Sequence, residues 1–87
     1  MEDEAGEQRT ETDKNIRVMF NVIRKCGENG CELEYLVLNR DSFAETVENI
    51  FFLSFLVKDG RAGITIENGK QIVGMWVYIS LFVSHVF

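Results

Sequence analysis

Histidine and cysteine are scarce in this chain of 87 residues, and their scarcity bears on chemistry. His85 is the single histidine, and neither Cys26 nor Cys31 has a base beside it in the sequence, so no catalytic constellation is predicted. A structural zinc site takes about four ligands, and these three residues fall one short. We therefore expect no enzyme activity, no metal and no cofactor. In a reducing compartment, Cys26 should act as a small buried side chain and Cys31 as a loop thiol.

The chain also lacks an excess of positive charge. Its formal charge of −5 and isoelectric point near 4.8 argue against a dedicated nucleic-acid binder. Six acids and one arginine lie in residues 1–13, so this segment holds the net charge and the rest of the chain is neutral. With almost nothing apolar to bury, residues 1–13 are predicted to be a disordered acidic tail. They also lack the apolar run of a secretory signal, which indicates an intracellular protein.

No apolar run is long enough to cross a bilayer. Residues 75–87 are nearly all apolar, but as a helix they would rise only about 20 Å, and the hydrocarbon layer is about 30 Å thick. We therefore expect no membrane partner. The segment is predicted to be a divergent apolar tail, either a strand packed on the core or an unpaired terminus.

Residues 14–26 form an amphipathic pattern of helical period, which Asp13 can cap and Gly27 can end. The apolar face holds Ile16, Val18, Met19, Phe20, Val22 and Ile23, with Met19 and Ile23 near its middle. The opposite face carries a basic stripe of Lys14, Arg17, Arg24 and Lys25. This stripe is either an ordinary solvated helix face or a contact for a phosphate backbone or an acidic partner.

A second helix is predicted from Ser42 to about Lys58, because Ser42 and Glu45 have the spacing of a capping box. Before it, residues 31–38 fit a short strand or a turn of helix. After it, two short runs with strand character, 64–67 and 70–73, flank Asn68-Gly69, the preferred dipeptide of a two-residue hairpin turn. Helix, helix and hairpin predict an α+β fold, a small winged-helix-like domain over residues 14–74 with the hairpin as its wing.

The two sides of the helix 42–58 differ in composition. The predicted core face consists of Phe43, Val47, Ile50, Phe51, Ser54 and Val57. The opposite side begins with Glu45, whose charge would repel DNA, and continues with the candidate partner-binding residues Glu48, Asn49, Phe52 and Leu56. Two interpretations of this side stay open. Either the C-terminal half of the helix is buried all round, or these residues form an exposed docking patch.

The stretch LVLNRDSFAETVENIF at residues 36–51, followed by LSFLVKDGR at 53–61, resembles a known family. It is similar to the C-terminal domain of the kleisin subunit, non-SMC element four, of the SMC five–six chromosome-maintenance complex, and it looks like the plant members. The similarity extends more loosely back over residues 16–26 and forward to about residue 72.

This resemblance implies a non-enzymatic winged-helix domain that docks on the ATPase head of an SMC protein, beside the other non-SMC elements. It further implies a chromosome-associated nuclear protein that acts in DNA repair, homologous recombination and chromosome maintenance, touching DNA only indirectly or weakly. Animal relatives include transcription regulators, so the alternative is a chromatin- or DNA-contacting adaptor or regulator that uses the basic stripe.

The chain departs from a full kleisin in two ways. It has no room for the N-terminal and middle regions of a kleisin in residues 1–40. It also has no proline, whereas family members continue past the hairpin into a segment containing glycine and proline. These departures suggest a truncated or alternatively spliced product, and a non-functional product is one form of that hypothesis.

Overall fold

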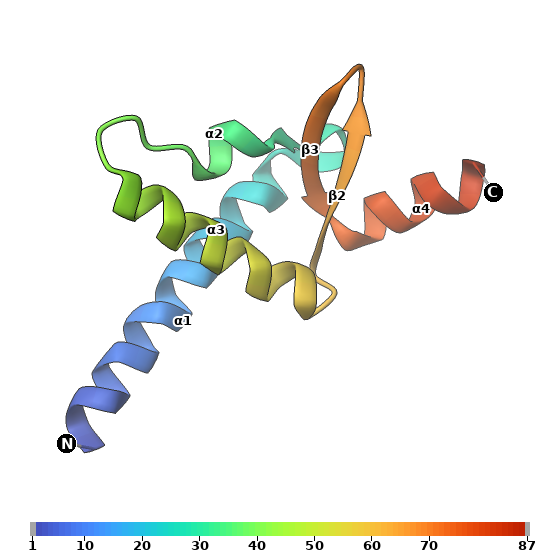
Figure 1. Cartoon of the computed structure of the whole chain (residues 1–87). Coiled ribbons are helices and arrows are strands. Elements are labelled where there is room, and N and C mark those ends of the chain that lie inside the picture. Colours follow the sequence, from blue (N-terminus) through green and yellow to red (C-terminus); the bar gives the residue numbers. More distant parts are fainter. Residues whose placement is uncertain (1, 87) are drawn as a thin grey trace.

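The chain folds into an α+β, winged-helix-like domain, as predicted (Figure 1). The structure is a computed structural model that describes residues 2–86, and the side chains of residues 11–81. The elements in chain order are α1 (Glu2–Lys25), the 3-10 turn η1 (Gly27–Asn29), β1 (Cys31–Glu32), α2 (Leu33–Val37), α3 (Phe43–Lys58), β2 (Ala62–Glu67), β3 (Lys70–Met75) and α4 (Trp76–Val86).

The predicted hairpin is confirmed and forms the wing. Strands β2 and β3 pair antiparallel from Ala62↔Met75 to Glu67↔Lys70. The turn residues Asn68 and Gly69 have φ values of 53° and 79°, as a type I′ turn requires. The two-residue strand β1 adds to the other edge of β3, so the sheet order is β1-β3-β2. Residues 31–38 thus contain both a strand and a helix, the two alternatives that the sequence left open.

Helix α1 begins at Glu2, far ahead of the predicted start at Lys14. Its 24 residues include most of the segment that the sequence predicts to be a disordered tail. Glutamate and glutamine are good helix formers, and acids near a helix N-terminus interact favourably with the helix dipole. Arg24 and Lys25 complement the dipole at the other end. The low apolar content that suggested disorder is therefore compatible with helical backbone, and Figure 1 shows this half of α1 projecting from the body.

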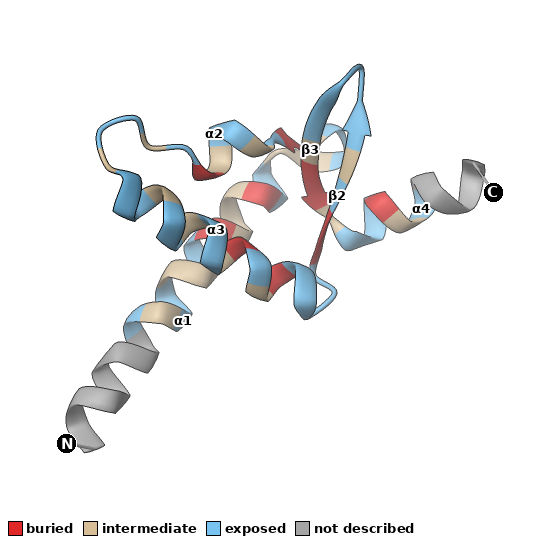
Figure 2. Cartoon of the chain, viewed as in Figure 1, coloured by how far each residue is buried: buried red, intermediate tan, exposed pale blue. Residues whose placement is uncertain are grey.

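The core lies where α1, α2 and α3 meet the sheet, and Figure 2 shows its buried segments in red. Met19 and Ile23 are buried in it, which confirms the predicted middle of the apolar face of α1. Arg61 lies over the ring of Phe20, 5.8 Å from its centroid, at the edge of that face. The buried members of the cluster are Met19, Ile23, Val37, Leu53, Leu56, Ala62 and Val73.

The apolar segment after the wing forms helix α4, not the strand or unpaired terminus that the sequence predicts. Its Ile79 is buried against the sheet, where Gly63 and Gly74 leave room for it. A Cβ on Gly63 would lie 3.0 Å from Cγ2 of Ile79. The run is apolar all round, so it shows no period that distinguishes a helix from a buried strand. No helix in the described part of the chain is long and apolar enough to span a membrane.

Cys26 and Cys31 form a disulfide, so the prediction of two separate thiols was wrong. Gly27 and Gly30 have φ values of 69° and 71° and turn the chain sharply between α1 and β1. This turn brings the two Cα atoms to 5.8 Å, a separation typical of disulfides. Among side chains 11–81, no three His, Cys, Asp or Glu residues lie together as metal ligands would.

Candidate protein interaction surface

The start of α3 is fixed by its predicted cap. Oγ of Ser42 accepts a hydrogen bond from the amide of Glu45 at 3.1 Å, which confirms the predicted helix start. The carboxylate of Glu45 accepts a hydrogen bond from the side-chain amide of Asn39, which lies in the loop before the helix. The cap therefore ties the helix to its preceding loop.

Asn39 and Asn49 hold α2, the loop and α3 together. The amide of Asn39 donates to Oγ1 of Thr46 at 2.8 Å, and its side-chain oxygen accepts from the amide of Asp41 at 2.9 Å. The side-chain amide of Asn49 donates to the carbonyl of Val37 at 3.1 Å and so fixes α2 against α3. Several polar residues of the LNRDSFAETVEN stretch therefore have structural roles.

The face of α3 that the sequence predicts to be the core face is exposed in the structure. Leu53 is 4% exposed and Leu56 is fully buried, whereas every residue of the predicted core face is exposed. The prediction used Glu45, Glu48 and Asn49 as markers of the solvent side, and of these the two glutamates are exposed while Asn49 is half-buried. However, α3 carries apolar residues on several of its sides, so its sequence does not mark one face clearly as the buried one. Asn49, in turn, is a polar residue that is hydrogen-bonded at the contact between α3 and α2.

The exposed side of α3 is mostly apolar, with Ser54 as a polar residue within it. We call it the α3 seam and define it as Phe43, Val47, Ile50, Phe51 and Val57. Phe43 is 84% exposed, and the other members are 40–54% exposed. Phe51 packs edge-on against the ring of Phe55, with 4.8 Å between centroids, which orients its ring. In Figure 2 most of the outward side of α3 is pale blue.

An apolar groove adjoins the seam. Its volume is about 460 Å³, and residues of α2, α3 and β2 line it. Its only polar lining side chains are Ser54, whose hydroxyl donates to the carbonyl of Phe51, and Lys58 at the end of the helix. The lining residues are Leu33, Val37, Ile50, Leu53, Ser54, Val57, Lys58 and Ile64.

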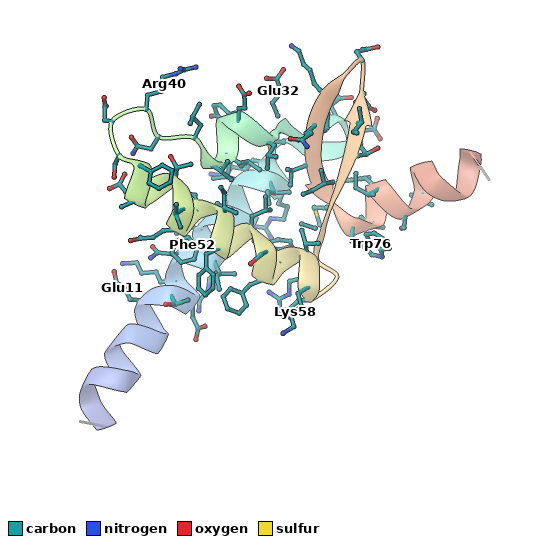
Figure 3. All side chains as sticks on the ribbon, viewed as in Figure 1. Glu11, Glu32, Arg40, Phe52, Lys58 and Trp76 are labelled. Atoms are coloured by element: carbon teal, nitrogen blue, oxygen red, sulfur yellow. A yellow bond between two sulfur atoms is a disulfide. The ribbon has the colours of Figure 1, made fainter. Side chains whose placement is uncertain are left out.

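The four predicted partner-binding residues do not form one surface. Leu56 lies in the core, and Glu48 is exposed. Phe52 is half-buried on the side of α3 that faces α1 (Figure 3), where it and Asn49 line a second hollow of about 440 Å³. Of the two interpretations that the sequence left open for this side of α3, burial in the domain therefore holds for Leu56 and in part for Phe52. The seam was missed as a surface because its residues were assigned to the core.

All four residues of the basic stripe, Lys14, Arg17, Arg24 and Lys25, are exposed on α1. Among side chains 11–81 the one ion pair is Lys70 with Glu32, at 3.0 Å across the sheet. The stripe therefore has no acidic partner among side chains 11–81.

Comparison with known proteins places the chain in a family. A family model described as Nse4 C-terminal matches residues 30–80. The chain is 53% identical over 68 residues to non-structural maintenance of chromosomes element 4 homolog B of Arabidopsis thaliana, covering 78% of this chain and 17% of that protein. It is 52% identical over 75 residues to homolog A of the same plant, covering 86% of this chain and 18% of that protein.

A more distant relative is the EP300-interacting inhibitor of differentiation 3 of Bos taurus, 30% identical over 60 residues, which covers 69% of this chain and 16% of that protein. No solved structure matches the chain. The chain spans less than a fifth of the length of the curated relatives it matches. Because the matched residues include α2, α3 and the wing, the chain belongs to the Nse4 C-terminal family.

Proposed function

We propose that the chain is a non-enzymatic, kleisin-type component of the SMC five–six complex and that it docks on the ATPase head of an SMC protein. Membership of the Nse4 C-terminal family and about half-identity to two plant element 4 homologs support this proposal. The observation that carries the docking step is the α3 seam, an apolar helix face with no cover within the described part of the chain.

The residues of the seam are suited to such an interface. Phe43 and Phe51 are large apolar side chains that gain about 1.5–3 kcal/mol each on full burial. Aromatic anchors of this kind carry much of the binding energy in protein interfaces. The groove next to the seam would receive an apolar side chain of the head, and Glu48 would lie at the polar edge of the contact.

Within such a complex, the chain would act in the nucleus on chromosomes, in DNA repair by homologous recombination. Its contribution would be to link the SMC head to the other non-SMC elements, and contact with DNA would be indirect. The sequence suggested Phe52 and Leu56 as docking residues. Because Leu56 is buried in the core, we assign the docking contact to the seam.

The direct test is binding of the full chain to the purified head domain of the matching SMC subunit. The double variant Phe43→Ala, Ile50→Ala should weaken binding at least about 30-fold, because hot-spot truncations cost about 2 kcal/mol or more. Its thermal midpoint should stay close to that of the wild type, since both side chains are exposed. The matched control is Ile66→Ala on the wing, 69% exposed, which should bind normally. Equal binding by all three chains would refute docking through the seam.

A second candidate is a DNA-contacting adaptor that uses the basic stripe, whose four side chains are exposed and unpaired among the described residues. Binding to duplex DNA should then fall steeply with salt. It should also disappear in the triple variant Arg17→Ala, Arg24→Ala, Lys25→Ala. Binding that ignores salt or survives this variant would rule out the stripe as the contact.

A further inference from the structure

The disulfide lies at the corner where the chain turns from α1 into the sheet. Cys26 follows the last residue of α1, and its amide donates to the carbonyls of Val22 and Ile23 at 3.2 and 3.1 Å. Cys31 is 6% exposed in β1 and pairs with Val73 of β3. The bond therefore joins the end of the core helix directly to the sheet.

Backbone contacts hold the same corner independently of the sulfurs. The amide of Gly30 donates to the carbonyl of Gly27 at 3.2 Å. Gly30 also packs so closely on β3 that an added Cβ would lie 2.7 Å from the carbonyl oxygen of Val73. Glu32, the next residue of β1, is paired with Lys70. We expect these contacts to keep Cys26 and Cys31 adjacent when the bond between them is broken.

The two sulfurs differ in access. Cys26 is half-buried in the turn, whereas Cys31 is buried within strand β1. Cys26 is thus the more exposed of the two residues, and access is one of the factors that decide which sulfur is attacked. Adjacent sulfurs, a preformed corner and one cysteine that is more exposed than the other are what reversible thiol–disulfide exchange requires.

We propose that Cys26 and Cys31 form a reversible redox site that regulates the stability of the α1–β1 corner. In the reducing direction, a thiolate of a small dithiol attacks Sγ of Cys26, and the bond to Cys31 breaks. Cys31 leaves as a thiolate and takes up a proton. The second thiol of the reductant then loses its proton and attacks the reductant sulfur that is bound to Cys26. The bond to Cys26 breaks, Cys26 takes up a proton, and the reductant leaves as an internal disulfide, so two electrons pass to the protein. In the reverse direction, a small-molecule disulfide such as oxidised glutathione accepts those two electrons.

The site acts on stability because the bond closes a loop that the unfolded chain would otherwise leave open. The two cysteines are 5 positions apart in the sequence, so the loop that the bond closes is short. Closing a loop of this size stabilises a fold in the chain-entropy account. For a domain of this length, the expected effect of reduction is a fall of roughly 10 °C in the thermal midpoint.

The test compares the full chain in buffers of oxidised glutathione and of dithiothreitol. After both samples are unfolded in guanidinium chloride and treated with iodoacetamide, mass spectrometry should find neither cysteine labelled in the oxidised sample and both labelled in the reduced sample. The reduced chain should keep its far-ultraviolet circular dichroism and melt about 10 °C lower. The variants Cys26→Ser and Cys31→Ala should melt at temperatures that do not depend on the redox buffer.

Three results would overturn the proposal. One is glutathione bound to the chain as a stable mixed disulfide. Another is a disulfide between two chains in place of the internal bond. The third is an internal bond whose reduction leaves the melting temperature unchanged. Because labelling is read separately from melting, a poorly folded variant does not obscure the result for the wild-type chain.

Discussion

At the scale of single residues, Ile23 and Leu56 are the clearest determinants of the fold. Both are fully buried, and they bring α1 and α3 into one core. Each has a neighbour on the same helix that points outward, Val18 on α1 and Val57 on α3, which are 55% and 40% exposed. These pairs allow the contribution of burial to be measured within a single helix.

Replacing Ile23 by alanine should lower the free energy of unfolding by about 2–4 kcal/mol, because it leaves a cavity in the core. Val18→Ala, on the exposed side of the same helix, should cost under about 1 kcal/mol. Chemical denaturation of both variants provides the measurement. An unchanged unfolding midpoint for Ile23→Ala would contradict the place of α1 in the core.

Leu56→Ala should reduce the free energy of unfolding by about 3 kcal/mol or more, since its side chain is fully buried. Val57→Ala, one residue on, should change stability by less than about 1 kcal/mol. Thermal unfolding followed by circular dichroism compares the two. If Leu56→Ala proved harmless and Val57→Ala destabilising, the helix face originally predicted from the sequence would be the buried one.

At the scale of elements, the turn between α1 and β1 offers a matched pair of glycines. Gly27 and Gly30 both have positive φ, but an added Cβ meets nothing at Gly27 and lies 2.7 Å from the carbonyl oxygen of Val73 at Gly30. A residue with a side chain at positive φ costs on the order of 1–3 kcal/mol, and Gly30, whose ψ is −171°, lies in a backbone region that essentially only glycine adopts. Only at Gly30 is there also a clash with the sheet.

Gly27→Ala should therefore lower the free energy of unfolding by about 1–3 kcal/mol. Gly30→Ala should lower it by at least about 1–3 kcal/mol more, the usual range for overpacking. Urea titration of the two variants under oxidising conditions measures the difference. Equal losses would show that β1 does not pack on β3 as closely as the structure has it.

Elements with strong local signals could be predicted from the sequence. Ser42 with Glu45 predicted the start of α3, and Asn68-Gly69 predicted the wing, because caps and two-residue turns depend on a few adjacent residues. The two residues of β1 are too few for any periodic pattern, and α4 is apolar on all sides. These two elements depend on contacts with the sheet, which are not local in the sequence.

The candidate surface was harder to predict than the fold. The sequence showed that α3 is apolar on more than one side, but which side is buried depends on how α1 and β2 pack against it. The disulfide was missed for a related reason. The spacing of Cys26 and Cys31 is compatible with two thiols, and only the turn at Gly27 and Gly30 brings them together.

At the scale of the whole molecule, the chain is elongated because α1 extends beyond the body (Figure 1). Its radius of gyration is 14.3 Å, whereas about 12 Å is expected for a compact domain of this length. Among side chains 11–81, Ile16 is the first apolar one of α1 that packs against the core. Residues 1–13 carry the net charge of the chain. Packing and charge are thus separated along one helix.

A chain that begins at residue 14 should keep its fold, and its thermal midpoint should fall by less than about 4 °C, a loss under about 1 kcal/mol. It should also be less soluble near neutral pH, since its formal charge would be close to zero. Removing residues 1–23 instead, which deletes Met19 and Ile23, should abolish cooperative unfolding. A chain from residue 14 that does not fold would place the domain boundary earlier in α1.

Trp76 lies where α4 leaves the sheet, with its amide bonded to the carbonyl of Arg61 at 2.9 Å and its ring next to Gly63. It is the single tryptophan of the chain and is 49% exposed. Its indole is therefore a natural fluorophore at the start of α4. The wavelength and the quenching of its emission should report whether this helix stays packed on the sheet. Far-ultraviolet circular dichroism sums over all helices, so the two signals together separate detachment of α4 from unfolding of the core.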